Sequence, residues 1–162
     1  MESYKHSDNQ IHADNQQGRL DPWWIVGFVD GEGCFSISIF KNKTTKLGSQ
    51  VFPEFVVTQG AKSVVVLEML QTYFGCGNIY VNRRADNHRE NLYRFCVRSL
   101  DDISLKIVPF FDNYALLTSK QQDFLVFKEV IGLMKNRSHL TDVGLSKIRE
   151  LASTSNRRKI RD

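Results

Sequence analysis

The sequence contains few cysteines, and their arrangement excludes a disulfide framework or a cysteine-based zinc site. Its 162 residues include three cysteines, Cys34, Cys76 and Cys96, with no CxxC pair among them. An odd number of dispersed thiols is typical of a reducing compartment, where such residues are small buried side chains.

Long apolar runs are missing as well. No stretch approaches the roughly 20 apolar residues that a membrane-spanning helix needs, and the first twenty residues lack the apolar segment of a signal peptide. These residues are rich in Asn, Gln, His and Asp, so residues 1–20 are predicted to be a disordered lead-in. Residues 21–162 are predicted to form a single domain, and we expect no membrane partner.

Several signatures of other nucleotide-acting enzymes are also absent. His88 lies in the HNH-like stretch DNHREN, but no second histidine follows at a suitable spacing. No acid-x-Lys element of the common restriction-enzyme type occurs, and the GxG stretches at 31–33 and 75–77 lack a P-loop lysine. The sequence therefore indicates neither of these nuclease types nor nucleotide hydrolysis, and we expect no small-molecule cofactor.

The chain has a moderate excess of basic residues. Its net charge is +4 and its isoelectric point is near 9.0. Residues 1–20 carry −1, with Lys5 and Arg19 against Glu2, Asp8 and Asp14, so residues 21–162 carry +5. A basic domain favours a polyanionic partner such as nucleic acid.

Hydrophobic periodicity predicts an α+β chain. Helical patterns occupy residues 22–30, 61–74, 101–108, 118–135 and 141–152, and the third of these is expected to end before Pro109. Alternating patterns indicate strands near residues 34–40, 51–58, 78–84 and 92–98. The resulting order is αββαββα, with a four-stranded antiparallel sheet and additional C-terminal helices.

One face of this sheet is expected to be polar and basic. The strand alternation places the following residues on it: Asn78, Tyr80, Asn82, Arg84, Arg94 and Arg98. Tyr, Asn and Arg side chains hydrogen-bond to base edges and phosphates, so this face is interpreted as a nucleic-acid surface. A solvated sheet face with no ligand is the alternative interpretation.

The stretch WWIVGFVDGEGCFSISIF, residues 23–40, joins the first helix to the first strand. Trp24, Gly27, Phe28 and Gly31 follow one another at helical spacing, so they share a face on which another helix can approach closely. Glu32 is expected just beyond the helix end, where unpaired carbonyls repel a carboxylate. A hard cation such as magnesium or calcium would make this arrangement favourable, because carboxylate and carbonyl oxygens are its ligands.

Residues 25–33, IVGFVDGEG, resemble the nine-residue LAGLIDADG motif of the homing endonuclease family. The segment FVVTQ (55–59) is similar to the family segment that ends in a catalytic-centre glutamine, and YALLTSKQQDFLVF (114–127) resembles the stretch that carries a catalytic-centre lysine. The αββαββα order agrees as well, so the resemblance covers nearly the whole chain after residue 20.

This resemblance implies a DNA endonuclease that makes a staggered, metal-dependent double-strand break in a long pseudo-palindromic site. Its fold would have a saddle-shaped sheet in the DNA major groove, and single-motif members form homodimers. Glu32, Gln59 and Lys120 would be the catalytic residues, with Gly31 and Glu32 as metal ligands. The metal would be Mg²⁺, for which Ca²⁺ or Mn²⁺ can substitute. Trp24, Gly27, Phe28 and Gly31 would form the dimer interface.

Direct contact with double-stranded DNA would fall to outward-facing strand residues. These are Ser36, Ser38, Phe40, Asn42, Gln50, Glu54, Asn78, Tyr80, Asn82, Arg84, Arg94 and Arg98. Glu54 would accept a hydrogen bond from cytosine, and the arginines would bind guanine or phosphate. Such enzymes resemble products of mobile introns, which suggests an organelle, a chloroplast before a mitochondrion.

Two alternatives stay open at this point. The first is a non-cleaving LAGLIDADG protein that binds DNA or RNA, such as an intron maturase or a regulator. The second is a small dimeric sheet protein that binds an acidic partner. The presence of Glu32 favours the endonuclease, because a protein that had lost cleavage would not need the metal-binding acid.

Overall fold

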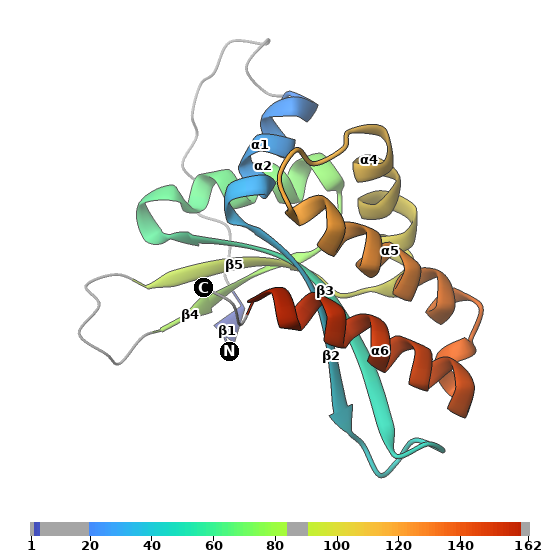
Figure 1. The fold of residues 1–162 in the computed structure, drawn as a ribbon. Coiled ribbons are helices and arrows are strands. Elements are labelled where there is room, and N and C mark those ends of the chain that lie inside the picture. Colours follow the sequence, from blue (N-terminus) through green and yellow to red (C-terminus); the bar gives the residue numbers. More distant parts are fainter. Residues whose placement is uncertain (1, 4–19, 84–90, 160–162) are drawn as a thin grey trace.

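The computed structural model describes residues 2–3, 20–83 and 91–159, and the side chains of residues 20–83 and 91–155 among them. The predicted order is confirmed (Figure 1). The elements are β1 (Glu2–Ser3), α1 (Pro22–Glu32), β2 (Gly33–Lys41), β3 (Ser49–Gly60), α2 (Val64–Phe74), β4 (Asn78–Asn82), β5 (Leu92–Val97), α3 (Leu100–Asp102), α4 (Val108–Asn113), α5 (Lys120–Lys135) and α6 (Asp142–Lys159). No helix among these is long and apolar enough to cross a membrane.

The sheet contains the four predicted antiparallel strands and one more. Its order is β1-β4-β5-β3-β2, and the added strand pairs Glu2 with Val81 and Ser3 with Tyr80 at the edge of β4. These two residues belong to the segment predicted to be a disordered lead-in, so that prediction does not hold for them. Residues 1 and 4–19 lie outside the described part of the chain.

Pro53 lies inside β3 without interrupting it. Strand β3 pairs with β2 from Ser49 to Val57 and places Pro53 opposite Ile37, but its pairing with β5 begins only at Phe55. Proline is tolerated here because this end of β3 has a hydrogen-bonded neighbour on one side only. The β2–β3 hairpin extends past the rest of the sheet at this end (Figure 1).

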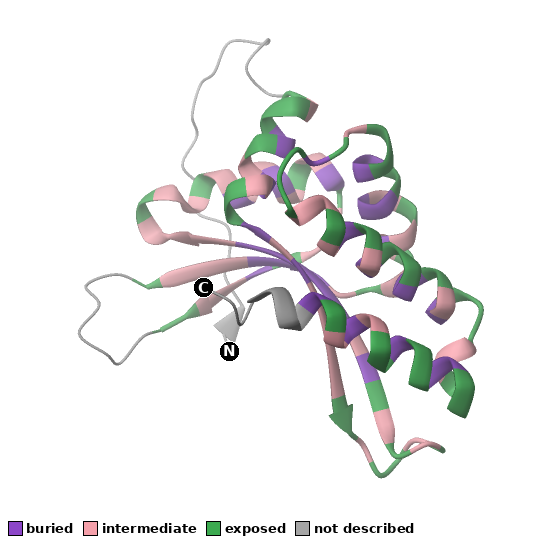
Figure 2. Cartoon of the chain, viewed as in Figure 1, coloured by how far each residue is buried: buried purple, intermediate pink, exposed green. Residues whose placement is uncertain are grey.

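The helices cover one face of the sheet and bury an aromatic core against it (Figure 2). The ring of Phe35 lies 5.3 Å from those of Phe55, Phe111 and Phe124, and 5.4 Å from that of Phe127. A second apolar cluster joins α5 and α6 to the hairpin; it contains Val51, Val130, Met134, Leu145 and Ile148.

The helical segment predicted to end before Pro109 continues through it. A π-helical turn over Ile103–Ile107 links α3 to α4, and the Val108 amide donates to the Ile103 carbonyl. A proline inside a regular α-helix clashes with the carbonyl four residues earlier. The wider π turn displaces that carbonyl, so α4 begins with proline in its first turn.

Candidate functional site

Helix α1 is fixed at its start by Asp21 and along one side by the core. The Asp21 carboxylate accepts hydrogen bonds from the amides of Trp23 at 2.8 Å and Trp24 at 3.1 Å. Ile25 and Val29 are completely buried on the sheet side. This anchoring determines where the far end of α1, with its acidic residues, is placed.

The helix ends two residues later than the sequence predicts. Gly31 is helical, Glu32 is the last helical residue, and Gly33 caps the helix in an extended conformation. A Cβ atom at Gly33 would lie 2.6 Å from Val29 Cγ1 and 2.9 Å from its carbonyl oxygen. The glycine is therefore needed for close approach at the junction with β2, and Glu32 stays exposed beside it.

Lys120 extends from the start of α5 to the end of α1. Its Nζ donates to the carbonyl oxygen of Val29 at 2.8 Å. Burial lowers the pKa of Lys120, while the nearby Cys34, Asp30, Asp123 and Glu32 oppose this effect. A cation is thus placed at the negative end of the α1 dipole, near Glu32.

Asp30 binds a segment that is remote in sequence. Its Oδ2 accepts from the Leu117 amide at 2.8 Å, and its Oδ1 accepts from the Thr118 hydroxyl at 2.7 Å. The same hydroxyl oxygen accepts from the Lys120 amide at 3.2 Å. Asp30 therefore ties the end of α1 to the start of α5, which no local pattern in the sequence indicated.

Gln59 lies at the end of the sheet where β2 follows α1. Gly33 pairs with Val57, and Gln59 is two residues further along β3, opposite Tyr93 of β5. The register therefore brings Gln59 to the junction of α1 and β2. The three residues expected to be catalytic thus come from α1, β3 and α5, which meet at this edge of the core.

The oxygen atoms at this junction fit a hard cation. The Glu32 side chain and the backbone of Gly31 are exposed together at the end of α1, and carboxylate with carbonyl oxygen is the donor set of Mg²⁺ or Ca²⁺. Within the described residues, no group of three His, Cys, Asp or Glu side chains could hold a metal ion.

The outer side of α1 is apolar, and no element among the described residues covers it. Trp24 is 43% exposed and stacks on Phe28, with ring centroids 5.0 Å apart. A Cβ atom at Gly27 or Gly31 would meet no described residue within 4 Å, so packing within the described part of the chain requires neither glycine. Figure 2 shows much of this side of α1 as exposed.

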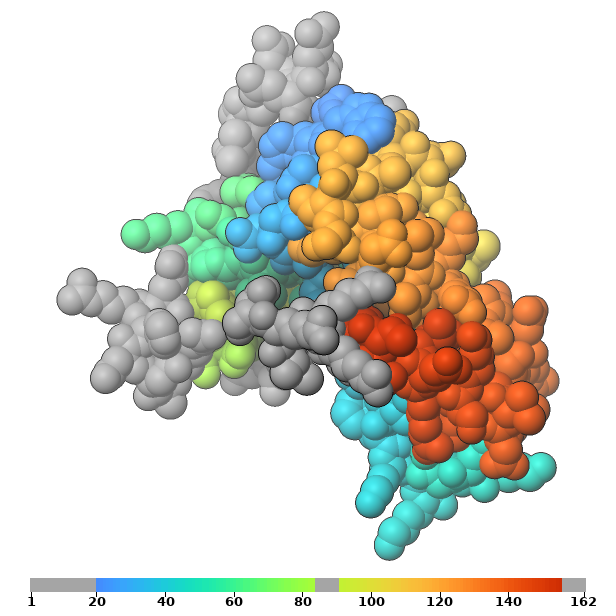
Figure 3. Space-filling model, in the orientation of Figure 1, coloured from blue at the N-terminus to red at the C-terminus, as the bar shows by residue number. Residues whose placement is uncertain are grey.

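Two further residues extend this apolar surface, and the sequence interpretation missed them. Trp23 is 56% exposed and contacts Tyr114 edge-on, with a centroid distance of 5.4 Å. Leu117 is 82% exposed on the segment that Asp30 holds against α1. In Figure 3 the surface of α1 is continuous with that of the segment before α5. Only the Asp30 contact places Leu117 here, and sequence spacing does not reveal it.

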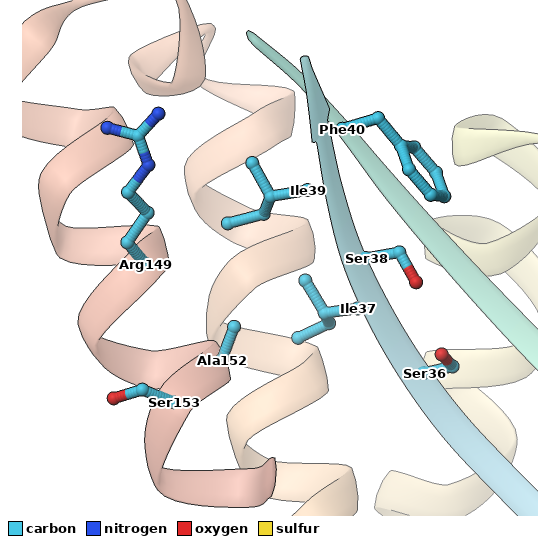
Figure 4. Close-up of a pocket in the computed structure, with 8 residues that line it drawn as sticks. All are labelled: Ser36, Ile37, Ser38, Ile39, Phe40, Arg149, Ala152 and Ser153. Carbon is cyan, nitrogen blue, oxygen red and sulfur yellow. The ribbon is translucent and has the colours of Figure 1, made fainter.

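The residues expected to contact DNA lie largely on the sheet face away from the helices. Figure 4 shows Ser36, Ser38 and Phe40 on one side of β2, with Ile37 and Ile39 on the side of α6. Asn42 and Gln50 meet at the hairpin, where Asn42 Nδ2 donates to Gln50 Oε1 at 2.9 Å.

The other strands continue the same polar face. Tyr80 of β4 pairs with Arg94 of β5, and Asn78 and Asn82 share the alternation of Tyr80. Arg98 follows β5 directly. Arg84 lies outside the described residues.

Glu54 was expected to be exposed and to accept a hydrogen bond from a base, but its surroundings differ. Its side chain is only 11% exposed, and it bonds to the guanidinium groups of both Arg94 and Arg98. Burial, together with the nearby Glu54, raises the pKa of the adjacent Cys96 to about 11. The acid is therefore part of a fixed charge cluster on the sheet face.

The αββαββα core and the acid at the end of its exposed, glycine-bearing helix define the fold class of the LAGLIDADG homing endonucleases. A family model described as "LAGLIDADG endonuclease" matches residues 25–131. The chain belongs to this family.

Known proteins of this family resemble the chain over most of its length. "Probable intron-encoded endonuclease 3" of Neurospora crassa is 34% identical over 143 residues, which are 88% of this chain and 26% of the relative. The homing endonuclease I-TnaI has a solved structure that matches with a TM-score of 0.74 and 40% identity, covering 83% of this chain and 86% of that one. I-SmaMI, "bound to uncleaved DNA target in the presence of Calcium ions", matches with a TM-score of 0.78 and 34% identity over 91% of this chain and 47% of its own.

The chain spans about a quarter of the length of the first curated relatives that it matches. It matches nearly all of I-TnaI but about half of I-SmaMI. The αββαββα unit therefore occurs in solved chains of about this length and in chains about twice as long.

Proposed function

We propose that this chain is the catalytic unit of a homing endonuclease that makes a staggered, metal-dependent double-strand break in a long, partly palindromic DNA site. The observation that carries this proposal is the position of Glu32, exposed at the end of α1, where the Lys120 ammonium group donates to the Val29 carbonyl of the same helix end. The αββαββα fold and the polar sheet face next to this junction support it.

Each residue of the junction has a defined part in this reaction. Glu32 and the Gly31 carbonyl would hold Mg²⁺, or Ca²⁺ or Mn²⁺ in its place. When bound, the cation would supply Lewis-acid stabilisation of the phosphodiester and lower the pKa of water. Gln59, at the end of β3, orients the attacking water. Lys120 places positive charge where negative charge accumulates in the transition state.

Cleavage of both DNA strands requires two such junctions. The exposed stripe of Trp24, Gly27, Phe28 and Gly31 supports pairing of α1 with an equivalent helix, because a Cβ atom added at either glycine would meet no described residue within 4 Å. We propose a second copy of this chain as the partner. The two-fold axis then relates two Glu32 carboxylates across the duplex.

A non-cleaving DNA-binding or RNA-binding protein of the same family is the second candidate function. The polar sheet face would serve either protein. The exposed Glu32 favours cleavage, since a carboxylate near DNA phosphates is repelled unless a cation accompanies it.

The deciding experiment is a magnesium-dependent cleavage assay on a site selected from randomised duplexes. Wild type is expected to cut both strands, and Glu32→Gln is expected to bind the same site with little change in affinity and to leave both strands intact. Glu129→Gln removes the same charge from an exposed ion pair between α5 and α6 and should cleave normally. If wild type binds a selected site but cuts neither strand with any divalent cation, the binding function holds instead.

The names of the relatives support an organellar source for this chain. The Neurospora crassa relative is named as intron-encoded, which supports a mobile intron of an organelle as the source of this chain. The expected preference for a chloroplast over a mitochondrion stays a prediction.

A further inference from the structure

The sheet face contains a buried acid beneath two half-exposed bases. Glu54 Oε1 accepts from Arg94 Nη2 at 3.2 Å, and Oε2 accepts from Arg98 Nε. The Glu54 side chain is 11% exposed, whereas those of Arg94 and Arg98 are 31% and 33% exposed. The carboxylate is therefore covered, and the guanidinium groups form the surface that a ligand on this face would meet.

Arg98 is held from a second direction by aromatic rings. Its Cζ lies 4.7 Å from the centre of the Tyr80 ring and 5.7 Å from that of Phe52. A guanidinium group bonded through Nε and stacked on a ring has little rotational freedom left. Among the described residues, its bond to Glu54 uses Nε, which leaves the edge with the two terminal amino groups for a ligand.

We propose that Glu54 is a positioning residue for base recognition. It orients Arg98, and through the shared carboxylate Arg94, so that the amino edge of Arg98 binds guanine in the major groove. Glu54 itself contacts no base. This inference rests on the proposed function, because it assumes that the sheet lies in the groove of its target DNA.

The chemistry of the groups favours guanine. Two parallel N–H donors of arginine match the O6 and N7 acceptors of guanine, the commonest specific contact in the major groove. An arginine without fixed orientation binds any phosphate as well, which adds affinity without sequence information. By fixing the orientation and cancelling one of the two positive charges, Glu54 reduces sequence-independent attraction and retains the base contact.

The test compares base preferences and salt dependence of wild type and Glu54→Gln on the selected site. Wild type is expected to prefer guanine at one base pair of each half-site by roughly 10-fold over the other bases. Glu54→Gln should lose most of this preference. It should also bind non-specific duplex more tightly, with a dependence of log K on log salt steeper by about one unit.

Arg98→Lys is a second variant that tests the same base contact. It keeps the proposal testable even if Glu54→Gln is unstable. It should lose the preference at the same base pair, because an ammonium group lacks the fork and the stacking plane. The double variant should lose no more preference than Arg98→Lys alone. If Glu54→Gln changes the preference at a different base pair, or if the losses of preference in the two single variants multiply in the double variant, Glu54 reads a base directly and the proposal is wrong. If Arg98→Lys instead loses affinity equally for all sequences, Arg98 binds a phosphate and the proposal is wrong as well.

A measurement without DNA separates this proposal from the proposed function. In the free protein, the Arg98 Nε–H should exchange slowly with water by NMR, and Glu54→Gln should make it exchange rapidly. The control Glu129→Gln should leave both this exchange and the base preferences unchanged. A wild type that selects a site but shows rapid Arg98 exchange refutes only the positioning role. A wild type that selects no site refutes the proposed function and this inference with it.

Discussion

At the scale of single residues, the same side-chain type has different roles according to what surrounds it. Glu32 is exposed at a helix end, Asp30 accepts hydrogen bonds from a remote segment, and Glu54 is buried under two arginines. The sequence identified all three as acids. Their surroundings separate the exposed acid that is proposed to bind a metal from a structural tie and from a charge partner of two arginines.

Asp30→Ala is expected to lower both stability and cleavage. Loss of the contacts to Leu117 and Thr118 should reduce the free energy of unfolding by about 1–2 kcal/mol, because charged hydrogen bonds are removed. The cleavage rate should fall further than stability explains, since Thr118 no longer holds the start of α5 and Lys120 moves. Urea unfolding and single-turnover cleavage measure the two effects.

Asp112→Ala is the matched control, because it removes a carboxylate from a surface ion pair with Lys128. It should change stability by less than about 1 kcal/mol and leave cleavage unchanged. Normal cleavage by a folded Asp30→Ala protein would show that Asp30 does not position Lys120.

Cys96 should be an unreactive thiol at neutral pH. Its pKa of about 11, against 9.0 for an ordinary thiol, keeps it protonated, and only the thiolate reacts with disulfide reagents. In a Cys34→Ser/Cys76→Ser background, modification should be slow at pH 8 and should accelerate as the pH rises from 9 toward 11. Rapid modification at pH 8 by a protein that remains folded would contradict the burial of this thiol.

At the scale of elements, two glycines of the segment that forms α1 and the start of β2 have different surroundings. Gly33 lies against Val29, whereas Gly27 faces open space on the outer side of α1. Periodicity predicted a helix followed by a strand here but ended the helix too early. The pattern does not show that the chain passes from helix to strand without an intervening turn.

Alanine at these positions should therefore have opposite effects on the isolated chain. Gly33→Ala should lower the free energy of unfolding by about 1–3 kcal/mol, because the methyl group overlaps Val29. Gly27→Ala should raise it by up to about 1 kcal/mol, since alanine is the better helix former and nothing obstructs it. Urea titrations at protein concentrations too low for self-association measure the free energy of unfolding of both variants. Equal destabilisation by both substitutions would mean that Gly27 is needed inside the chain.

At the scale of the whole molecule, the chain has an exposed apolar surface on α1 and, near it, a set of potential catalytic residues. Trp23, Trp24, Phe28 and Leu117 contribute to this surface. Apolar side chains grouped in this way indicate an interaction site. Under the proposed function, pairing of two copies through this surface would complete a two-fold active site. Association and cleavage should therefore be lost together.

Trp24→Glu is expected to give a folded monomer that no longer makes double-strand breaks. A carboxylate on the contact face would be buried without a partner on association. Val143→Glu is the matched control: Val143 is 84% exposed at the start of α6, which lies at the opposite end of the molecule from α1 in Figure 1. Sedimentation velocity with and without the selected duplex measures association. A wild type that stays monomeric on its duplex would refute pairing through this face.

The sequence by itself determined the order of the elements and the family. These features depend on local periodicity and on a motif of consecutive residues, which a single chain displays directly. The tertiary structure decided the rest: the passage of a helix through Pro109, the contact of Asp30 with Leu117 and Thr118, and the two bonds of Glu54. Each of these depends on which remote groups lie within hydrogen-bonding or van der Waals distance, and strand pairing and helix packing determine that proximity.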